Sequence, residues 1–141
     1  MAIDGVISVP DNPDHMMSVD PVAGRVRVLA GDMVLADSVR ALRVTEVHRR
    51  IAAPVFYFPD ADLVAPLALT DAPQTFCPLK GTARYLALVD PNDAPDDSSP
   101  PARSQIAWRY VEPLAFATVL AGHTAFYQDT VRIELFGAGV A

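Results

Sequence analysis

Short segments in which apolar and polar residues alternate make up most of this sequence, and prolines or turn-forming residues separate them. The clearest example is Arg25–Ala30, where Val26 and Val28 share one side, which is the two-residue period of a half-buried strand. Gly31–Asp32 follows as a two-residue hairpin turn, because glycine at the first turn position permits a positive φ. Many short strands of this kind predict a mainly β fold with a meandering chain path.

Further strand candidates follow along the chain, and one segment favours a helix. The strand candidates are Met33–Ala36, Arg40–Thr45, Pro54–Phe58, Thr82–Val89 and Gln105–Val111, with Thr124–Tyr127 and Val131–Phe136 expected to close the chain as a hairpin. The one short helix is expected near the C-terminus at Leu114–Ala121, because Pro113 suits a first helical turn and Gly122 suits the position after the last one. The proline-rich segment 60–74 predicts turns with at most one short strand.

The length of 141 residues predicts one domain, flanked and interrupted by irregular segments. Residues 1–23 are rich in Pro and Asp and predict an N-terminal arm with at most one short strand, near Met16–Val19. Residues 24–137 predict a single β domain. Within it, residues 90–103 predict a mobile insertion between two strands, because this segment has no apolar anchor.

Composition and charge exclude several classes of function. The net charge is −6, and the basic residues form no concentrated patch, so we expect no nucleic-acid binding. No apolar run reaches the length of a membrane span, and the first residues lack the basic region of a secretory signal, so we expect a cytoplasmic protein with no membrane contact. A single cysteine excludes an internal disulfide and a multi-cysteine zinc site, and we expect no metal and no cofactor. The oligomeric state stays open.

Five separated strings occur in an order that resembles one known family. They are ADSVRAL at 36–42, PVFYFP at 54–59, TFCPLKGTARY at 75–85, AWRYVEP at 107–113 and GHTAFY at 122–127. Together they closely resemble the bacterial and fungal domain-of-unknown-function family 427 (DUF427), from about His15 to Phe136. The resemblance implies a compact β-tent fold similar to Mss4-like proteins, here in a form without the zinc cysteines. The family also carries a loose nucleotidyltransferase label, but this chain has Asp60 where a basic residue commonly follows the turn.

Three side chains could carry chemistry, and each has a structural alternative. Lys80 is the one lysine beside ten arginines, so its compact ammonium either holds a ligand's phosphate or carboxylate, activates a neighbouring thiol, or ties its loop to backbone carbonyls. Cys77 is either a thiol activated for nucleophilic or redox chemistry or a small buried apolar residue. His123 is either a general acid or base near neutral pH or a cap for the carbonyls of the preceding helix.

Every tyrosine and the one tryptophan fall inside the family-like strings: Tyr57, Tyr85, Trp108, Tyr110 and Tyr127. Aromatic side chains with a polar atom commonly line sites for small flat ligands, although they also fill the cores of small β domains. Asp60 and Asp62 could form a metal-binding pair, but a turn does not guarantee that both face one side. His15 and His48 are interpreted as structural or exposed.

These residues lead to three hypotheses of different classes. The first is a small-molecule binding domain for a planar or anionic ligand, with an aromatic pocket bordered by Lys80. The second is an enzyme, either thiol-based through Cys77 or with a nucleotidyltransferase-like activity. The third is a structural scaffold. The first hypothesis predicts that Cys77, Lys80, Trp108, His123 and Tyr127 cluster in space, with Lys80 and Trp108 on the same side.

Overall fold

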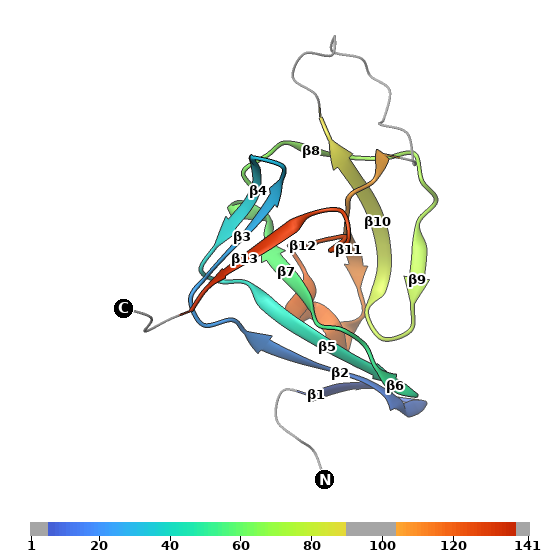
Figure 1. Ribbon diagram of the computed structural model, residues 1–141. Helices are drawn as coiled ribbons and strands as arrows, with labels where there is room; N and C mark the ends of the chain where they lie inside the picture. The colour runs from blue at the N-terminus through green and yellow to red at the C-terminus, as the bar shows by residue number, and fades with distance from the viewer. Residues whose placement is uncertain (1–5, 90–103, 138–141) are drawn as a thin grey trace.

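Antiparallel strands form most of the chain in the computed structural model, which describes residues 6–89 and 104–137 (Figure 1). The predicted insertion at 90–103 lies outside the described residues. The strands are β1 (Val6–Val9), β2 (Asn12–Pro21), β3 (Arg25–Ala30), β4 (Met33–Ser38), β5 (Leu42–His48), β6 (Arg50–Ile51), β7 (Val55–Pro59), β8 (Leu67–Leu69), β9 (Thr75–Cys77), β10 (Gly81–Leu88), β11 (Ala107–Pro113), β12 (His123–Phe126) and β13 (Arg132–Phe136). The 3₁₀ helices are η1 (Asp60–Asp62) and η3 (Ala115–Leu120). The prediction of a mainly β fold is therefore confirmed.

The strands form two sheets. The larger has ten strands in the order β1-β2-β5-β7-β12-β11-β10-β8, with β6 paired to β5 and β9 paired to β10. The smaller has three strands in the order β13-β3-β4. The large sheet curls, so that the turn between β9 and β10 comes close to the end of β5 (Figure 1).

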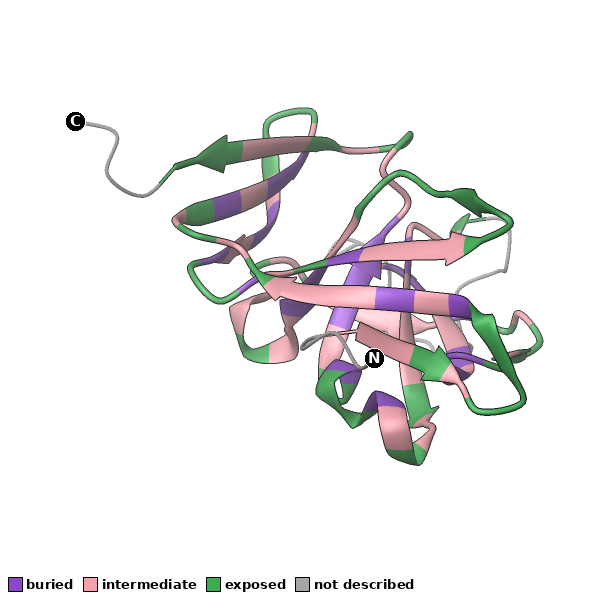
Figure 2. Ribbon diagram, turned by 90° about the horizontal axis from the view of Figure 1, so that it is seen from below, coloured by how far each residue is buried: buried purple, intermediate pink, exposed green. Residues whose placement is uncertain are grey.

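Each face of the large sheet packs into its own core, because alternate residues of a strand point to opposite faces. In β7, Phe58 packs with residues of the small sheet such as Val26 and Val28, whereas the neighbouring Tyr57 packs on the other face with Met17. We call the face that carries Tyr57 the inner face. Figure 2 shows the buried residues running through the middle of these strands, with exposed residues towards the turns.

The hairpins of the central chain agree with the predictions. Gly31 has a φ of +58°, and Ala30 pairs with Met33 across the two-residue turn. The predicted strands at Thr82–Val89 and Gln105–Val111 correspond to β10 and β11, which pair antiparallel. The predicted strands at Arg40–Thr45 and Pro54–Phe58 correspond to β5 and β7, which also pair.

The N-terminal arm is a correction, because its residues belong to the large sheet. β1 pairs with β2, and β2 pairs with β5 from Met16 to Pro21. The apolar residues on one side of β2 are few, but Met17 is fully buried and His15 nearly so. The surrounding Asp and Pro residues obscured this alternation in the sequence, since they occupy the exposed positions and the ends of the strand.

Near the C-terminus one prediction is confirmed and one needs correction. The expected short helix at Leu114–Ala121 is present as the 3₁₀ helix η3, which is interrupted at Ala117 and has no side-chain cap at its start. The expected closing hairpin does not form, because β12 pairs with β7 and β11 whereas β13 crosses to pair with β3 in the small sheet. Gly122 follows η3 with a φ of +70°, as predicted for the residue after a helix. In residues 6–89 and 104–137, neither helix has the length and apolar character needed to span a bilayer.

Candidate functional site

Aromatic side chains from five places in the sequence lie together on the inner face, and we call them the aromatic row. Its members are Tyr57 on β7, Tyr85 on β10, Trp108 and Tyr110 on β11, and Tyr127 after β12. Strand register produces the row, since Tyr57 pairs with Ala125, Ala125 pairs with Trp108, and Trp108 pairs with Tyr85. Residues paired directly across neighbouring strands point to the same face.

Ala125 allows the rings on either side of it to approach each other. The ring centroids of Tyr57 and Trp108 are 6.3 Å apart at an interplanar angle of 89°, across the small alanine side chain. Tyr110 lies 6.5 Å from Tyr57, and Tyr127 lies 5.0 Å from Trp108. Tyr57 is fully buried, but the other four aromatic residues are only half-buried, so the row continues from the core to the surface.

Polar groups flank the exposed part of the row. The hydroxyls of Thr75 and Tyr85 are 2.6 Å apart. The Nε2 atom of Gln105 donates to the hydroxyl of Tyr127 at 2.7 Å. These contacts fix two phenol rings at the margin of the row and add hydrogen-bonding groups beside it.

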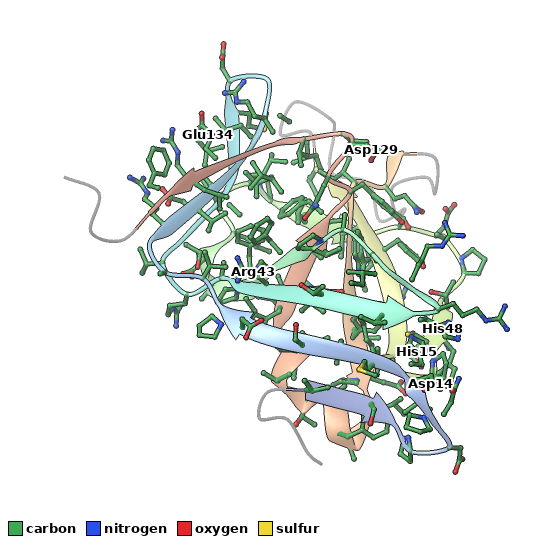
Figure 3. All side chains as sticks on the ribbon, turned by 60° about the horizontal axis from the view of Figure 1, so that its bottom comes forward. Asp14, His15, Arg43, His48, Asp129 and Glu134 are labelled. Atoms are coloured by element: carbon green, nitrogen blue, oxygen red, sulfur yellow. The ribbon has the colours of Figure 1, made fainter. Side chains whose placement is uncertain are left out.

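A charged cluster lies at the other end of the inner face, and it consists of Glu46, Lys80 and His15. The Lys80 Nζ atom donates to Oε1 of Glu46, and the Nε2 atom of His15 is 2.8 Å from Oε2 of the same carboxylate. Because a carboxylate only accepts, Nε2 of His15 carries the proton in this contact. His48 stacks on His15 with ring centroids 4.3 Å apart, and Figure 3 shows the two residues together near the start of β2 and the end of β5. The cluster therefore joins β2, β5 and the β9–β10 turn.

Backbone contacts hold Lys80 in the position from which it reaches Glu46. The N–H of Lys80 donates to the carbonyl of Cys77 at 3.2 Å, and its carbonyl accepts from the N–H of Leu114 at 2.9 Å. The next residue, Gly81, has a φ of +124° and pairs with Pro113 on β11. The sequence Lys-Gly thus turns the chain tightly against β11 while the lysine side chain crosses the curled sheet.

The charged state of the cluster follows from its contacts. Burial by itself raises the pKa of Glu46, but the hydrogen bonds from Lys80 and His15 outweigh burial, and the pKa lies below its ordinary value. Burial by itself lowers the pKa of Lys80, but the oxygen of Tyr57 and the carboxylate of Glu46 outweigh it, and the pKa lies above its ordinary value. Both groups are therefore charged at neutral pH.

The two inner tyrosines keep their protons at neutral pH. Burial raises the pKa of Tyr57, and neighbouring Lys80 and Trp108 only partly oppose this effect. Burial also raises the pKa of Tyr110, and the nearby Tyr57, Cys77 and Glu46 raise it further. Both hydroxyls can thus act as hydrogen-bond donors and not as bases.

The predicted residues converge in part. Lys80 interacts electrostatically with Tyr57 and Cys77, and Tyr57 contacts Trp108, so Lys80 and Trp108 lie on the same side of the sheet. Cys77 is half-buried and packs at the edge of the inner core. His123 instead bonds locally, with Nδ1 2.9 Å from the carbonyl oxygen of Ala121 at the end of η3. This contact favours the capping interpretation of His123.

Asp60 and Asp62 have separate partners and do not converge. Asp60 accepts from the hydroxyl of Thr124 at 2.7 Å, and Asp62 accepts from the hydroxyl of Ser38 at 2.6 Å and from Arg40 at 3.0 Å. Within the described ranges, no set of three or more His, Cys, Asp or Glu side chains is arranged to hold a metal ion.

Sequence reasoning missed Glu46, whereas the structural interpretation of His15 agrees with its buried contact to this carboxylate. Position 46 follows Leu42 and Val44 at two-residue spacing on β5, so a carboxylate there points to the inner face where an apolar residue is usual. A carboxylate on a buried face requires a charged or hydrogen-bonding partner, so Glu46 at this position indicated that such a partner lies nearby. Its partner could not be identified from sequence, because Lys80 lies 34 positions away and reaches Glu46 only through the curl of the sheet.

Comparison with known proteins identifies a family for this chain. A protein-family model described as a domain of unknown function (DUF427) matches residues 18–137. No curated protein matches the chain.

Proposed function

This chain belongs to the DUF427 family, and from that premise we propose that its inner face binds a small planar ligand against the aromatic row. We also propose that the fold is a β-tent and that the protein is cytoplasmic. Trp108 and Tyr127 would provide the ring surface on which the ligand stacks. The hydroxyls of Tyr110 and Tyr85 and the amide of Gln105 would provide hydrogen bonds at its edge.

The observation that supports this proposal is the partial exposure of four members of the row. A core aromatic residue is normally enclosed, as Tyr57 is, but Trp108, Tyr85, Tyr110 and Tyr127 retain solvent contact while lying on one face. Contiguous half-exposed rings with hydrogen-bonding groups beside them are typical of sites for small flat molecules. Contacts with Gln105 and Thr75 fix two of the rings, which lowers the entropy cost of binding.

The enzyme alternatives receive less support. A thiol reaction at Cys77 would need the ammonium of Lys80 for activation, but that ammonium is paired with Glu46. A nucleotidyltransferase-like reaction would need carboxylates that share a metal ion, but Asp60 and Asp62 point to different partners. The scaffold hypothesis predicts no role for the half-exposed rings, and the binding experiment below separates it from the proposal.

A binding screen with two variants tests the proposal. Ligand-detected saturation-transfer NMR with a set of one- and two-ring planar compounds is expected to give binders for the wild type. Trp108→Leu is expected to weaken these binders about tenfold, since one stacked ring contributes roughly 1–1.5 kcal/mol. Phe76→Leu is the matched control, because Phe76 is an aromatic residue on β9 that is 64% exposed.

The outcome that would contradict the proposal is equal binding to the wild type and Trp108→Leu. Circular dichroism of both variants must show the wild-type spectrum, so that a loss of binding is not a loss of fold. If Phe76→Leu weakens binding as much as Trp108→Leu, the ligand sits elsewhere and the proposed site is wrong.

A further inference from the structure

The single lysine of the sequence suggests that the aromatic row offers a positive charge to a ligand, but the contacts of Lys80 indicate otherwise. Lys80 is the one lysine of the sequence, and its side chain is only 9% exposed and paired with Glu46. The carboxylate of Glu46 is the more accessible partner, with 29% of its side chain exposed. A ligand that approaches the charged cluster from solvent therefore meets an acceptor before it meets the ammonium.

Glu46 lies close enough to the row to affect its members. Its negative charge contributes to the raised pKa of both Tyr57 and Tyr110. It also lies on the same face of the sheet as Val44, which packs with Tyr57 in the inner core. Glu46 therefore shares the inner face with the end of the row formed by Tyr57 and Tyr110.

The faces of the aromatic rings also disfavour a negatively charged ligand. The face of an aromatic ring is the negative part of its quadrupole, so it attracts cations and N–H groups and repels anions. The net charge of −6 acts in the same direction over the whole molecule. Lys80, the cation beside Tyr57, is already neutralised by Glu46.

We infer that the ligand of this site is a planar molecule that carries N–H donors and no negative charge, of the carboxamide or amidine class. This inference rests on the proposed binding function. Its N–H groups would be accepted by hydroxyl oxygens of the row, its ring would stack on Trp108, and the negative charge of Glu46 on the same face would favour it over an anion. An anion held by Lys80, which the sequence suggested, would have to displace Glu46 and leave a partly buried carboxylate unpaired.

Three compounds of nearly equal shape test the inference, because they differ mainly in charge: benzamidine, benzamide and benzoate. Trp108 is the one tryptophan of the sequence, so quenching of its fluorescence reports binding at the row. For the wild type we expect benzamidine and benzamide to bind at least about threefold to tenfold more tightly than benzoate. Tighter binding of benzoate would overturn the inference while leaving the proposed function intact, whereas quenching by none of the three at about 10 mM would contradict the proposed function itself.

The variant Glu46→Gln tests whether this carboxylate sets the preference. The glutamine oxygen still accepts from Lys80, so the change removes the negative charge with little change in shape. We expect the benzamidine-to-benzoate affinity ratio to fall about tenfold, while benzamide changes less than threefold. An unchanged ratio in a variant with the wild-type circular dichroism spectrum would show that Glu46 is not the group that selects the ligand.

Discussion

Replacing Gly81 with alanine is expected to destabilise the protein by more than about 4 kcal/mol, which is enough to prevent folding in a marginally stable domain. A Cβ atom at this position would lie 2.3 Å from the carbonyl oxygen of Glu112 and 2.8 Å from the N atom of Leu114 and the Cα atom of Pro113. These are backbone atoms of β11 and of the residue that follows it, and they cannot move aside as a flexible side chain can. The φ of +124° adds strain for any residue with a Cβ atom.

Gly31→Ala provides the matched control for this prediction. Gly31 also has a positive φ, +58°, but a Cβ atom there would meet nothing within 4 Å. Its substitution is therefore expected to cost only about 1 kcal/mol, from the backbone conformation alone. Thermal unfolding followed by circular dichroism measures both variants, and a similar loss in the two would show that β11 does not press against the Lys80–Gly81 turn.

Lys80→Met is expected to lower the free energy of unfolding by about 2 kcal/mol and the melting temperature by about 7 °C. The substitution preserves most of the apolar stem but leaves the carboxylate of Glu46 without its ammonium partner. Breaking a fully buried pair costs about 3–5 kcal/mol. The loss expected here is smaller, about 2 kcal/mol, because water reaches part of the Glu46 side chain. The double variant Lys80→Met with Glu46→Gln should lose about 1 kcal/mol less than the sum of the single losses.

The dependence of stability on pH provides an independent measurement of the same cluster. The pKa of Glu46 is lowered in the folded protein, so its contribution is present above the ordinary value of 4.5 and is lost as the pH falls through the folded value. The wild type should therefore lose more stability than Glu46→Gln between pH 7 and low pH. Additive losses in the double variant, with parallel pH profiles for the wild type and Glu46→Gln, would show that the ion pair contributes no coupling.

Local patterns were sufficient to predict most of the central strands. The alternation in Arg25–Ala30 and the glycine at position 31 specify a hairpin through the chain itself, without reference to distant residues. The same is true of the aromatic strand at Pro54–Phe58, whose residues have a strong preference for extended structure. The aromatic row also depends on period-two alternation, but its assembly needs the register of four strands, which the sequence does not specify.

The incorrect predictions share a physical cause, which is that long-range pairing decided the structure. Residues 12–21 are polar enough to predict only a short strand near Met16–Val19, yet β2 extends from Asn12 to Pro21 because it pairs with both β1 and β5. β13 is adjacent to β12 in the sequence but pairs with β3, because the apolar side of Ile133 completes the core beneath the small sheet. For the same reason the sequence could not decide whether Lys80 binds a ligand, activates a thiol or has a structural role. Its partner, Glu46, comes close only through the curl of the sheet.

The central claim, that the half-exposed rings of the inner face form a binding surface, is tested most directly at the indole of Trp108. As the sequence has one tryptophan, the Nε1–H of Trp108 gives a single side-chain signal in a ¹H–¹⁵N NMR spectrum. On titration with benzamidine, this signal is expected to shift and to saturate together with the backbone amides of Tyr110 and Tyr127. A stationary indole signal, with shifts confined to amides outside the inner face, would contradict the claim.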